Sequence, residues 1–335
     1  MNEHIETIDG FGELESTRTK VISEKGDFGP LVIYQGQSIT FVSFGLLVGL
    51  GALMGLMNTW FYLGAYQIVP NANQAGQLAL TLALGAPLSA YIVTRLLDLK
   101  TWLSGEKTFI EYIRTVSFGL WGGLVGGLLI LTIFALQTHT PLWALLDAFA
   151  LGVPLAQIMG RLGCLNYGCC HGKECSSEHQ PGIQYHNSQT KVLRFAPELK
   201  GKRLHPTQVY SILANMSIYG IIVTLALVWE ARPLGMLAAT YMTLYGLKRF
   251  SVEFLRGEFP RVYFMGLTVW QWFSLTFIIQ GVVIAVLIFS NPTQVGLADP
   301  GLGWQSMLSA FGVLLLTSTI MGLVYGTHGR KIGSW

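Results

Sequence analysis

Long apolar segments separated by shorter polar stretches dominate the pattern of hydrophobic positions along this chain. A helix needs about 20 apolar residues to cross a bilayer. The sequence predicts such segments at 39–64, 76–97, 113–136, 142–162, 207–229, 234–256, 266–290 and 303–326. Because no water satisfies backbone polar groups inside lipid, spans of this kind form helices and not an open sheet. We therefore expect an all-α, polytopic membrane protein with eight spans.

The composition agrees with this pattern. Only 12% of the 335 residues are charged and 51% are hydrophobic, whereas soluble domains carry about 25% charged residues. The first 37 residues differ from the rest, because they hold seven acidic residues and no apolar run long enough for a signal peptide. We expect residues 1–37 to form a polar tail or surface segment, with no cleavable signal.

Positive charge is distributed unevenly over the connections. In an eight-span arrangement, 20 of the 21 lysines and arginines lie on one side of the membrane, and the exception is Arg232. The positive-inside rule then places both termini, and the face with most connections, in the cytoplasm. A face this basic would also meet anionic lipid head groups.

The end of the fourth predicted span carries the densest cluster of reactive residue types. The stretch from 160 to 172 reads GRLGCLNYGCCHG and places Arg161 among thiols at the membrane border. Ionisable residues inside a membrane are costly and usually functional. Asp147 lies about four helical turns before Arg161 and is expected on the same face. The alternatives are a structural ion pair, or an arginine that reaches the interface.

The sixth predicted span carries a polar stripe. Tyr245, Arg249, Glu253 and Arg256 have spacings that place them on one side of a helix. Arg249 and Glu253 are four residues apart and can form an ion pair. Since arginine binds phosphate with two parallel hydrogen bonds, Arg161 and Arg249 together predict a phosphate clamp. Arg256 lies nearer the membrane edge, where it either binds substrate or reaches the interface.

All four cysteines fall within twelve residues, at positions 164, 169, 170 and 175, with His171 among them. Their spacing is not that of a familiar zinc motif. Four interpretations stay open: a metal site formed by Cys164, Cys169, Cys170 and His171, a reactive thiolate activated by a nearby arginine, a disulfide in an oxidising compartment, or small residues that fill a tight loop.

His205 precedes the fifth predicted span, directly before Pro206. Proline fits the first turn of a helix, which places His205 at the cap and Gln208 one turn in. The imidazole is either a general base, a hydrogen-bond donor to phosphate, or an ordinary residue of the cap region.

Taken together, these motifs resemble those of the prolipoprotein diacylglyceryl transferase family over about residues 40–290, or seven spans. The matching positions are Gly160, Arg161, Gly163, Gly168 and Gly172, then His205 to Tyr210, then Tyr245, Gly246, Arg249, Phe250, Glu253, Phe254 and Arg256. The resemblance implies a transferase-like membrane domain over 38–290, and an additional helix with a short tail over 291–335.

The resemblance also implies a function and a location. It implies a phospholipid-dependent enzyme of the bacterial inner membrane that moves a diacylglyceryl group from phosphatidylglycerol to a thiol. The expected partners are an anionic phospholipid, the membrane, and a lipoprotein precursor or other thiol acceptor, with no nucleic acid. The implied catalytic residues are Arg161, Arg249, His205, Tyr245 and Glu253. The implied substrate-binding residues are Gly160, Gly163, Gln208, Tyr210, Arg256, Gly122 and Gly123.

Departures from the family pattern keep other chemistries open. Trp121 stands where the family has a histidine, Cys164 replaces an asparagine, and Cys169 replaces a glutamate. Ser211 and Pro87 replace a further glutamate and arginine. No cofactor is implied, apart from a metal ion at the cysteine and histidine cluster. The alternative functions are a lipid enzyme that uses a cysteine thiolate or a Cys/His-bound metal, and a non-catalytic lipid-binding relative.

Overall fold

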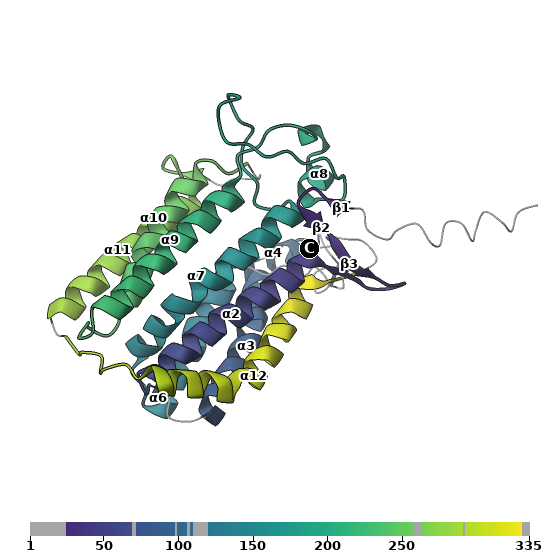
Figure 1. The fold of residues 1–335 in the computed structure, drawn as a ribbon. Helices are drawn as coiled ribbons and strands as arrows, with labels where there is room; N and C mark the ends of the chain where they lie inside the picture. The colour runs from purple at the N-terminus through teal and green to yellow at the C-terminus, as the bar shows by residue number, and fades with distance from the viewer. Residues whose placement is uncertain are drawn as a thin grey trace, which may run out of the picture.

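A bundle of long helices forms the molecule, with short strands at one end (Figure 1). The computed structural model describes residues 25–68, 72–97, 99–105, 108–109, 120–257, 263–290 and 292–329. The long helices are α2 (Ser43–Ala65), α3 (Ala72–Leu97), α6 (Leu120–Thr138), α7 (Leu142–Tyr167), α9 (Thr207–Val228), α10 (Met236–Glu253), α11 (Val269–Ser290) and α12 (Pro300–Gly326). Three short helical segments are α4 (Leu99–Leu103), α8 (Lys191–Phe195) and η1 (Pro197–Leu199). The prediction of an all-α, multi-pass membrane protein is confirmed.

Each long helix falls on one of the eight predicted segments, but only six of them are long and apolar enough to span a bilayer. Those six are α2, α3, α7, α9, α11 and α12. The predicted span 113–136 begins outside the described residues, and its apolar helical part covers Val125–Thr138. In α10, Lys248, Arg249 and Glu253 interrupt the apolar sequence. The prediction of eight apolar spans is thus confirmed for six, and the charges of α10 belong to a buried cluster described below.

Close packing of small residues sets the order of the helices. Helix α2 lies between α12 and α7, and α9, α10 and α11 follow on the α7 side, as Figure 1 shows. Gly45 of α2 faces Gly326 and Gly322 of α12 so closely that any side chain at position 45 would overlap their backbone. On the other side, Gly55 of α2 meets Gly152 of α7 in the same way. Glycines permit such approaches where lipid provides no hydrophobic force between helices.

Short strands close one end of the bundle. They are β1 (Lys25–Gly26) paired with β2 (Gly29–Pro30), the sheet β3 (Val32–Gln35), β4 (Thr40–Val42) and β7 (Thr327–His328), and the hairpin β5 (Tyr263–Phe264) with β6 (Leu267–Thr268), all antiparallel. Asn166 near the end of α7 donates to the carbonyl of Pro30 at 2.9 Å and to Ser43 at 2.7 Å. The described part of the predicted tail therefore forms strands that pack against the end of α7, because apolar Leu31 and Val42 are buried there beside Tyr167.

At the opposite end of the bundle, buried charges serve the fold. The carboxylate of Asp147 accepts hydrogen bonds from the backbone of Gly235 at 2.8 Å and Ala238 at 2.9 Å, and so caps the start of α10. Arg232 is fully buried and donates to the hydroxyls of Tyr62 and Tyr66. Asp147 therefore does not form the structural ion pair with Arg161 that the sequence left open as an alternative. Fourteen helical residues separate the two by about 21 Å, and α10 supplies the partners of Asp147.

Candidate functional site

Helix α7 extends to Tyr167, five residues beyond its predicted end, so that Arg161 and Cys164 lie within its last turns. Gly168 ends the helix in the left-handed conformation, with a φ of 77°. A glycine adopts this conformation without steric cost. The chain reverses there, and the backbone of Cys169 donates to the carbonyl of Cys164 at 3.1 Å. This reversal brings Cys169 and Cys170 back toward the helix.

The start of α9 and the end of α10 hold the returning loop in place. Thr207 donates to the carbonyl of Cys170 at 2.6 Å, and the amide of Gln208 donates to the carbonyl of Cys169 at 2.8 Å. The backbone N–H of Gly257 donates to the backbone carbonyl of His171 at 3.0 Å, and that of Gly172 donates to the backbone carbonyl of His205 at 3.0 Å. The positions of Cys169 and Cys170 in the loop are therefore fixed by the first two residues of α9.

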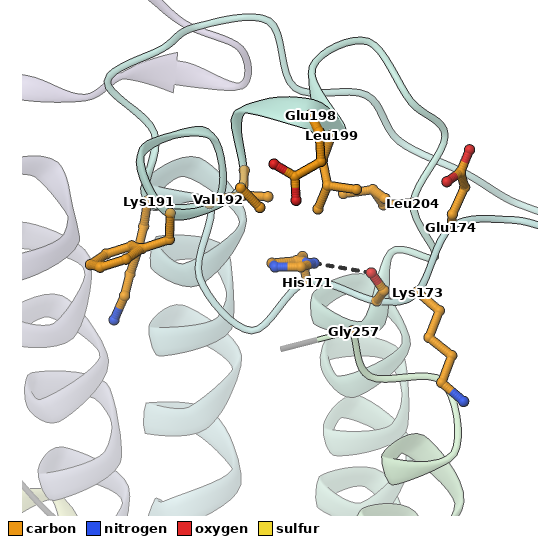
Figure 2. A pocket seen from close by; sticks show the side chains of 13 residues that line it. His171, Lys173, Glu174, Lys191, Val192, Glu198, Leu199, Leu204 and Gly257 are labelled. Carbon is orange, nitrogen blue, oxygen red and sulfur yellow. Dashed lines mark hydrogen bonds between the residues drawn. The ribbon is translucent and has the colours of Figure 1, made fainter. Parts of the chain in front are cut away.

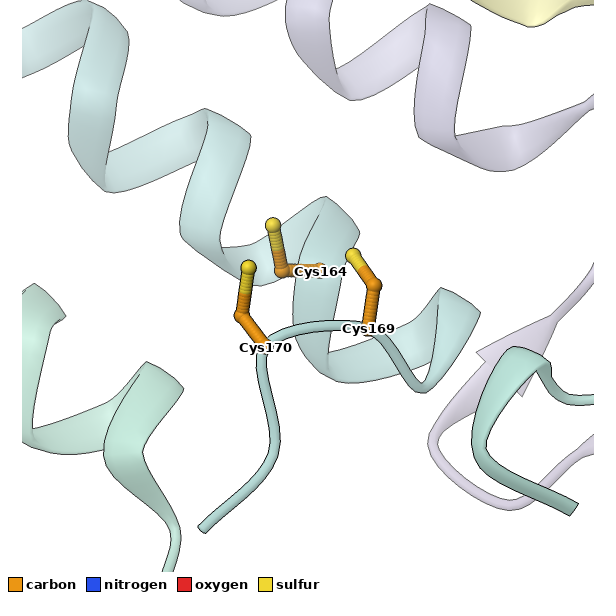
Figure 3. Close-up of side chains that lie close together, drawn as sticks. All are labelled: Cys164, Cys169 and Cys170. Carbon is orange, nitrogen blue, oxygen red and sulfur yellow. The ribbon is translucent and has the colours of Figure 1, made fainter. Parts of the chain in front are cut away.

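Three of the four thiols converge. The Sγ atoms of Cys164, Cys169 and Cys170 all lie within 4.8 Å of one another, as Figure 3 shows. Cys170 has a positive φ of 58°, which is unusual for a residue with a side chain. Cys175 is apart from them and donates to the carbonyl of Pro181 at 3.5 Å. All four thiols are free in the structure. We call Cys164, Cys169 and Cys170 the thiol trio.

Within the trio, Cys170 is the thiol that ionises most readily. The thiols of Cys164 and Cys169 donate hydrogen bonds to its sulfur, and the guanidinium groups of Arg256 and Arg161 lie near it. These hydrogen bonds and charges lower the pKa of Cys170 well below the ordinary thiol value, against the opposing effect of burial.

His171 is not part of this group. Its Nδ1 lies 3.0 Å from the carbonyl oxygen of Gly172, and its ring lies on the floor of a cleft of about 670 Å³ (Figure 2). The walls of the cleft include Val192 and Phe195 of α8 and Leu199 of η1. The expectation that His171 joins the cysteines around a metal ion does not fit this geometry, because the group of close ligand atoms contains the trio alone.

A second cluster gathers positive charge beside the trio. Arg249 Nη2 lies 3.1 Å from Glu253 Oε2, and Arg256 Nε lies 4.0 Å from the same oxygen. The Arg249 guanidinium also stacks over the ring of Trp270, 5.2 Å from its centre. The carboxylate of Glu253 is nearly fully buried, with 3% of its side chain exposed. The stripe predicted on α10 thus forms an ion-paired unit.

Arg161 meets this unit from α7. Its charge lies near the sulfurs of Cys170 and Cys164 and the phenol of Tyr245. It also lies close enough to Arg249 for the two guanidinium groups to repel each other. Among the residues that the structure describes, Arg161 has no hydrogen bond or ion pair. The two arginines predicted to form a phosphate clamp therefore converge, and one of them has no protein partner in the described chain.

Lys248 is a member of the cluster that the motifs did not single out. It is buried, and it donates to Asn215 of α9 at 2.8 Å and to Gln157 of α7 at 3.5 Å. Its ammonium group lies 4.2 Å from the centre of the Tyr245 ring and near both Arg161 and Arg249. The sequence signal for this residue is a lysine within the predicted span 234–256, next to Arg249.

Other predicted residues make their side-chain contacts with the loops beside the cluster. His205 Nδ1 is 3.3 Å from the hydroxyl of Tyr210, which in turn donates to the carbonyl of Pro181 in the outer loop. Gln208 is fully buried and supports the cysteine loop, with a second bond to Tyr185. For His205, Tyr210 and Gln208 the structure gives contacts that hold the loop, and not contacts with the arginines.

The predicted glycines have differing surroundings. A side chain at Gly122 would overlap Ala90 of α3, and one at Gly163 would lie 2.8 Å from the ring of Phe44. Both positions are therefore helix contacts. Gly123 has only ordinary contacts, whereas Gly160, one residue before Arg161, borders open space. Of the four, Gly160 is best placed to leave room for a ligand.

The fold and these contacts define a polytopic membrane protein with a buried, net cationic site next to three thiols. Over residues 30–287 the sequence matches the model of the family described as prolipoprotein diacylglyceryl transferase. Because this match covers most of the chain, the protein belongs to that family.

Similar proteins from other bacteria carry the corresponding name. A phosphatidylglycerol–prolipoprotein diacylglyceryl transferase of Clostridium tetani is 29% identical over 217 residues, which cover 64% of this chain and 80% of the relative. The second such transferase of Clostridium perfringens is 28% identical over 245 residues, 72% of this chain and 89% of the relative. One from Streptococcus pneumoniae is 30% identical over 173 residues, 51% of this chain and 61% of the relative.

Proposed function

We propose that this protein transfers the diacylglyceryl group of phosphatidylglycerol, or a closely similar anionic lipid, to the thiol of a lipoprotein precursor or another thiol acceptor. The observation that carries the proposal is the excess of buried positive charge where α7 and α10 meet. The family membership and the names of the relatives point to the same substrates.

The charge count at the site calls for an anion. Arg161, Lys248 and Arg249 lie near one another, and in the part of the chain that the structure describes Arg161 and Lys248 have no carboxylate partner. Burying unbalanced charge is costly, and in membranes such charges mark functional sites. A lipid phosphate that enters sideways from the bilayer would supply the missing negative charge between Arg161 and Arg249.

The same geometry supports the chemistry of transfer. In the proposed step, the acceptor thiolate attacks the carbon of the diacylglycerol unit that is bonded to the phosphate oxygen. A C–S bond forms, the C–O bond breaks, and glycerol phosphate leaves with one additional negative charge. Arginines directed at the phosphate stabilise this developing charge, an effect worth about 3–4 kcal/mol for a well-placed donor.

Neighbouring residues have supporting roles in this proposal. Glu253 orients Arg249 and Arg256, and the phenol of Tyr245 lies beside Arg161, where it can donate to the head group. His205 and Gln208 act indirectly, because they fix the loop that carries the cysteines. Gly160 leaves space next to Arg161.

A reconstituted transfer assay tests the proposal. Purified protein in vesicles that contain phosphatidylglycerol should add one diacylglyceryl mass to a lipobox peptide, as read by mass spectrometry. Arg161→Ala and Arg249→Ala should each lower the rate by 10² to 10³. Lys202→Ala is the matched control, because Lys202 is an exposed cation paired with Glu174 on the surface. Wild-type protein that modifies no peptide would contradict the proposal.

Two other results would favour the alternative functions. A diacylglyceryl adduct on one of the protein's own cysteines would indicate a covalent mechanism. A lipid that co-purifies with the protein and is never turned over would indicate a lipid-binding relative without catalytic activity.

We infer the orientation from charge alone. The end of the bundle that carries the site is predicted to face the cytoplasm of a bacterial inner membrane, together with both termini, because Arg232 is the single cation assigned to the other side. A cysteine placed at exposed Lys202, in a Cys175→Ser background, should react with an impermeant maleimide only after the membrane is opened. Labelling of intact spheroplasts would reverse the orientation.

A further inference from the structure

The thiol trio has the dimensions of a metal site. Thiolates bound to zinc lie about 2.3 Å from the ion, which places them about 3.8 Å from one another in a tetrahedral arrangement. The Sγ atoms of the trio lie within 4.8 Å of one another before any ion draws them together. Small side-chain rotations are enough to close the remaining gap.

The backbone around the trio is fixed in advance. Cys164 is held by α7, whereas Thr207 and Gln208 hold the carbonyls of Cys170 and Cys169. Cys170 keeps its left-handed φ of 58° within this network. Backbone strain of this kind persists only where the surroundings enforce it, and it is concentrated at functional sites. Here the conformation turns the third sulfur toward the other two (Figure 3).

The surrounding charges favour a metal–thiolate complex. Three thiolates around a divalent ion carry a net charge of −1. Arg161 lies near all three sulfurs, and Arg256 lies near Cys170. Positively charged groups next to the ligands stabilise such an anionic complex and fix its orientation.

The trio offers three protein ligands and no fourth among the residues that the structure describes. His171 faces the cleft, and Cys175 is bonded to Pro181. Structural zinc sites have four protein ligands, whereas catalytic zinc sites have three and leave one position for water or substrate. The geometry of the trio is that of the second kind.

The proposed reaction needs a group that ionises the acceptor thiol. Two candidates for a general base have other contacts: Glu253 pairs with Arg249 and Arg256, and the Nδ1 of His205 lies 3.3 Å from the hydroxyl of Tyr210. A bound metal ion would ionise the acceptor thiol without a general base, because a thiol that coordinates a metal ion loses its proton outright.

We propose that Cys164, Cys169 and Cys170 bind one zinc ion, whose open fourth position takes the acceptor thiol. This inference rests on the proposed transferase function, since it assigns the means by which that enzyme activates its acceptor. On coordination the thiol releases its proton to water. The resulting thiolate attacks the glycerol carbon as described above, and the thioether product, a weaker ligand, leaves the ion.

Metal titration of the full-length protein in detergent tests the site. After chelation and removal of the chelator, wild type should bind one equivalent of Zn²⁺ or Co²⁺ per chain, and Co²⁺ should give thiolate-to-metal charge-transfer bands. Cys164→Ser, Cys169→Ser and Cys170→Ser should each weaken binding at least tenfold. Cys175→Ser and His171→Ala are the matched controls and should bind as wild type does. Wild type that binds no stoichiometric metal, or that binds equally well after loss of a trio cysteine, would overturn the proposal.

A second measurement requires no variant of the protein. A lipobox peptide should shift the Co²⁺ spectrum when it enters the fourth position, and the same peptide with serine in place of cysteine should not. An unchanged spectrum would overturn the assignment of the acceptor position.

The transfer assay separates this inference from the proposed function. Chelated wild type should lose transfer, and one equivalent of Zn²⁺ should restore it. Full transfer by metal-free protein would overturn the zinc proposal and leave the transferase intact. If the protein binds one metal ion per chain and the peptide shifts the Co²⁺ spectrum, but no transfer occurs, the transferase function would be overturned and the metal site would stand.

Discussion

Glu253 forms a 3.1 Å ion pair with Arg249, one turn earlier on α10, and the Arg249 guanidinium also stacks over the ring of Trp270. Arg256 approaches the same carboxylate oxygen from the other side at 4.0 Å. One buried carboxylate therefore positions two arginines, while Arg161 approaches from a different helix.

Replacing Glu253 should affect stability as well as activity. Glu253→Ala removes the carboxylate that pairs with Arg249 and Arg256 and leaves like charges near each other, and breaking a buried pair in this way costs about 3–5 kcal/mol. Glu253→Gln keeps the shape and one acceptor, so it should be less damaging. Thermal unfolding in detergent measures the difference. Equal melting temperatures for wild type and Glu253→Ala would contradict a role for the pair in holding α10.

Arg161→Lys separates charge from shape. Lysine keeps the positive charge but lacks the planar, two-pronged donor of arginine. Transfer should therefore fall at least tenfold in Arg161→Lys and further in Arg161→Ala. Kinetic assays over a range of phosphatidylglycerol contents in the vesicles measure both variants. Full activity of Arg161→Lys would mean that Arg161 contributes only a point charge.

Lys248→Met should lower the affinity for anionic lipid without lowering the stability of the protein. Lys248 is buried near the charges of Arg161 and Arg249, and it donates hydrogen bonds to the neutral amides of Asn215 and Gln157. Removing its charge relieves repulsion, so the melting temperature should stay equal or rise. The apparent affinity for anionic lipid should fall about tenfold, or 1.4 kcal/mol. A clear loss of stability with unchanged lipid affinity would show that Lys248 is structural.

Asp147→Ala should lower the stability of the protein and leave its lipid binding unchanged. Because Asp147 caps α10 at the far end of the bundle, its loss should lower stability by about 1–2 kcal/mol. The Michaelis constant for lipid should stay the same, since neither Gly235 nor Ala238 lies in the arginine cluster. Unfolding curves and transfer kinetics on the same preparation test both parts. A changed lipid affinity would show that Asp147 contributes to lipid binding and contradict its assignment as a helix cap.

The sequence predicted what depends on local spacing. Apolar segments of about twenty residues predicted the helices, and the four-residue interval between Arg249 and Glu253 predicted their ion pair. Both follow from the geometry of a single helix. The convergence of Arg161 with Arg249 joins two different helices, so spacing could not predict it, and the prediction came from the preference of arginine for phosphate.

Features that depend on tertiary packing escaped prediction. Asp147 shares a helix with Arg161, yet its partners come from the start of α10. The burial of Lys248 depends on Asn215 and Gln157, which belong to two other helices. The trio depends on the chain reversal at Gly168, which turns the C-x4-C-C spacing into three neighbouring sulfurs and leaves His171 outside.

The central claim is that Arg161 and Arg249 together bind the phosphate of one lipid. Its most direct test is an experimental structure of the protein in nanodiscs that contain phosphatidylglycerol. We predict density for a lipid phosphate within about 3 Å of both guanidinium groups. A phosphate bound elsewhere on the protein, with protein side chains or water alone between Arg161 and Arg249, would contradict the claim.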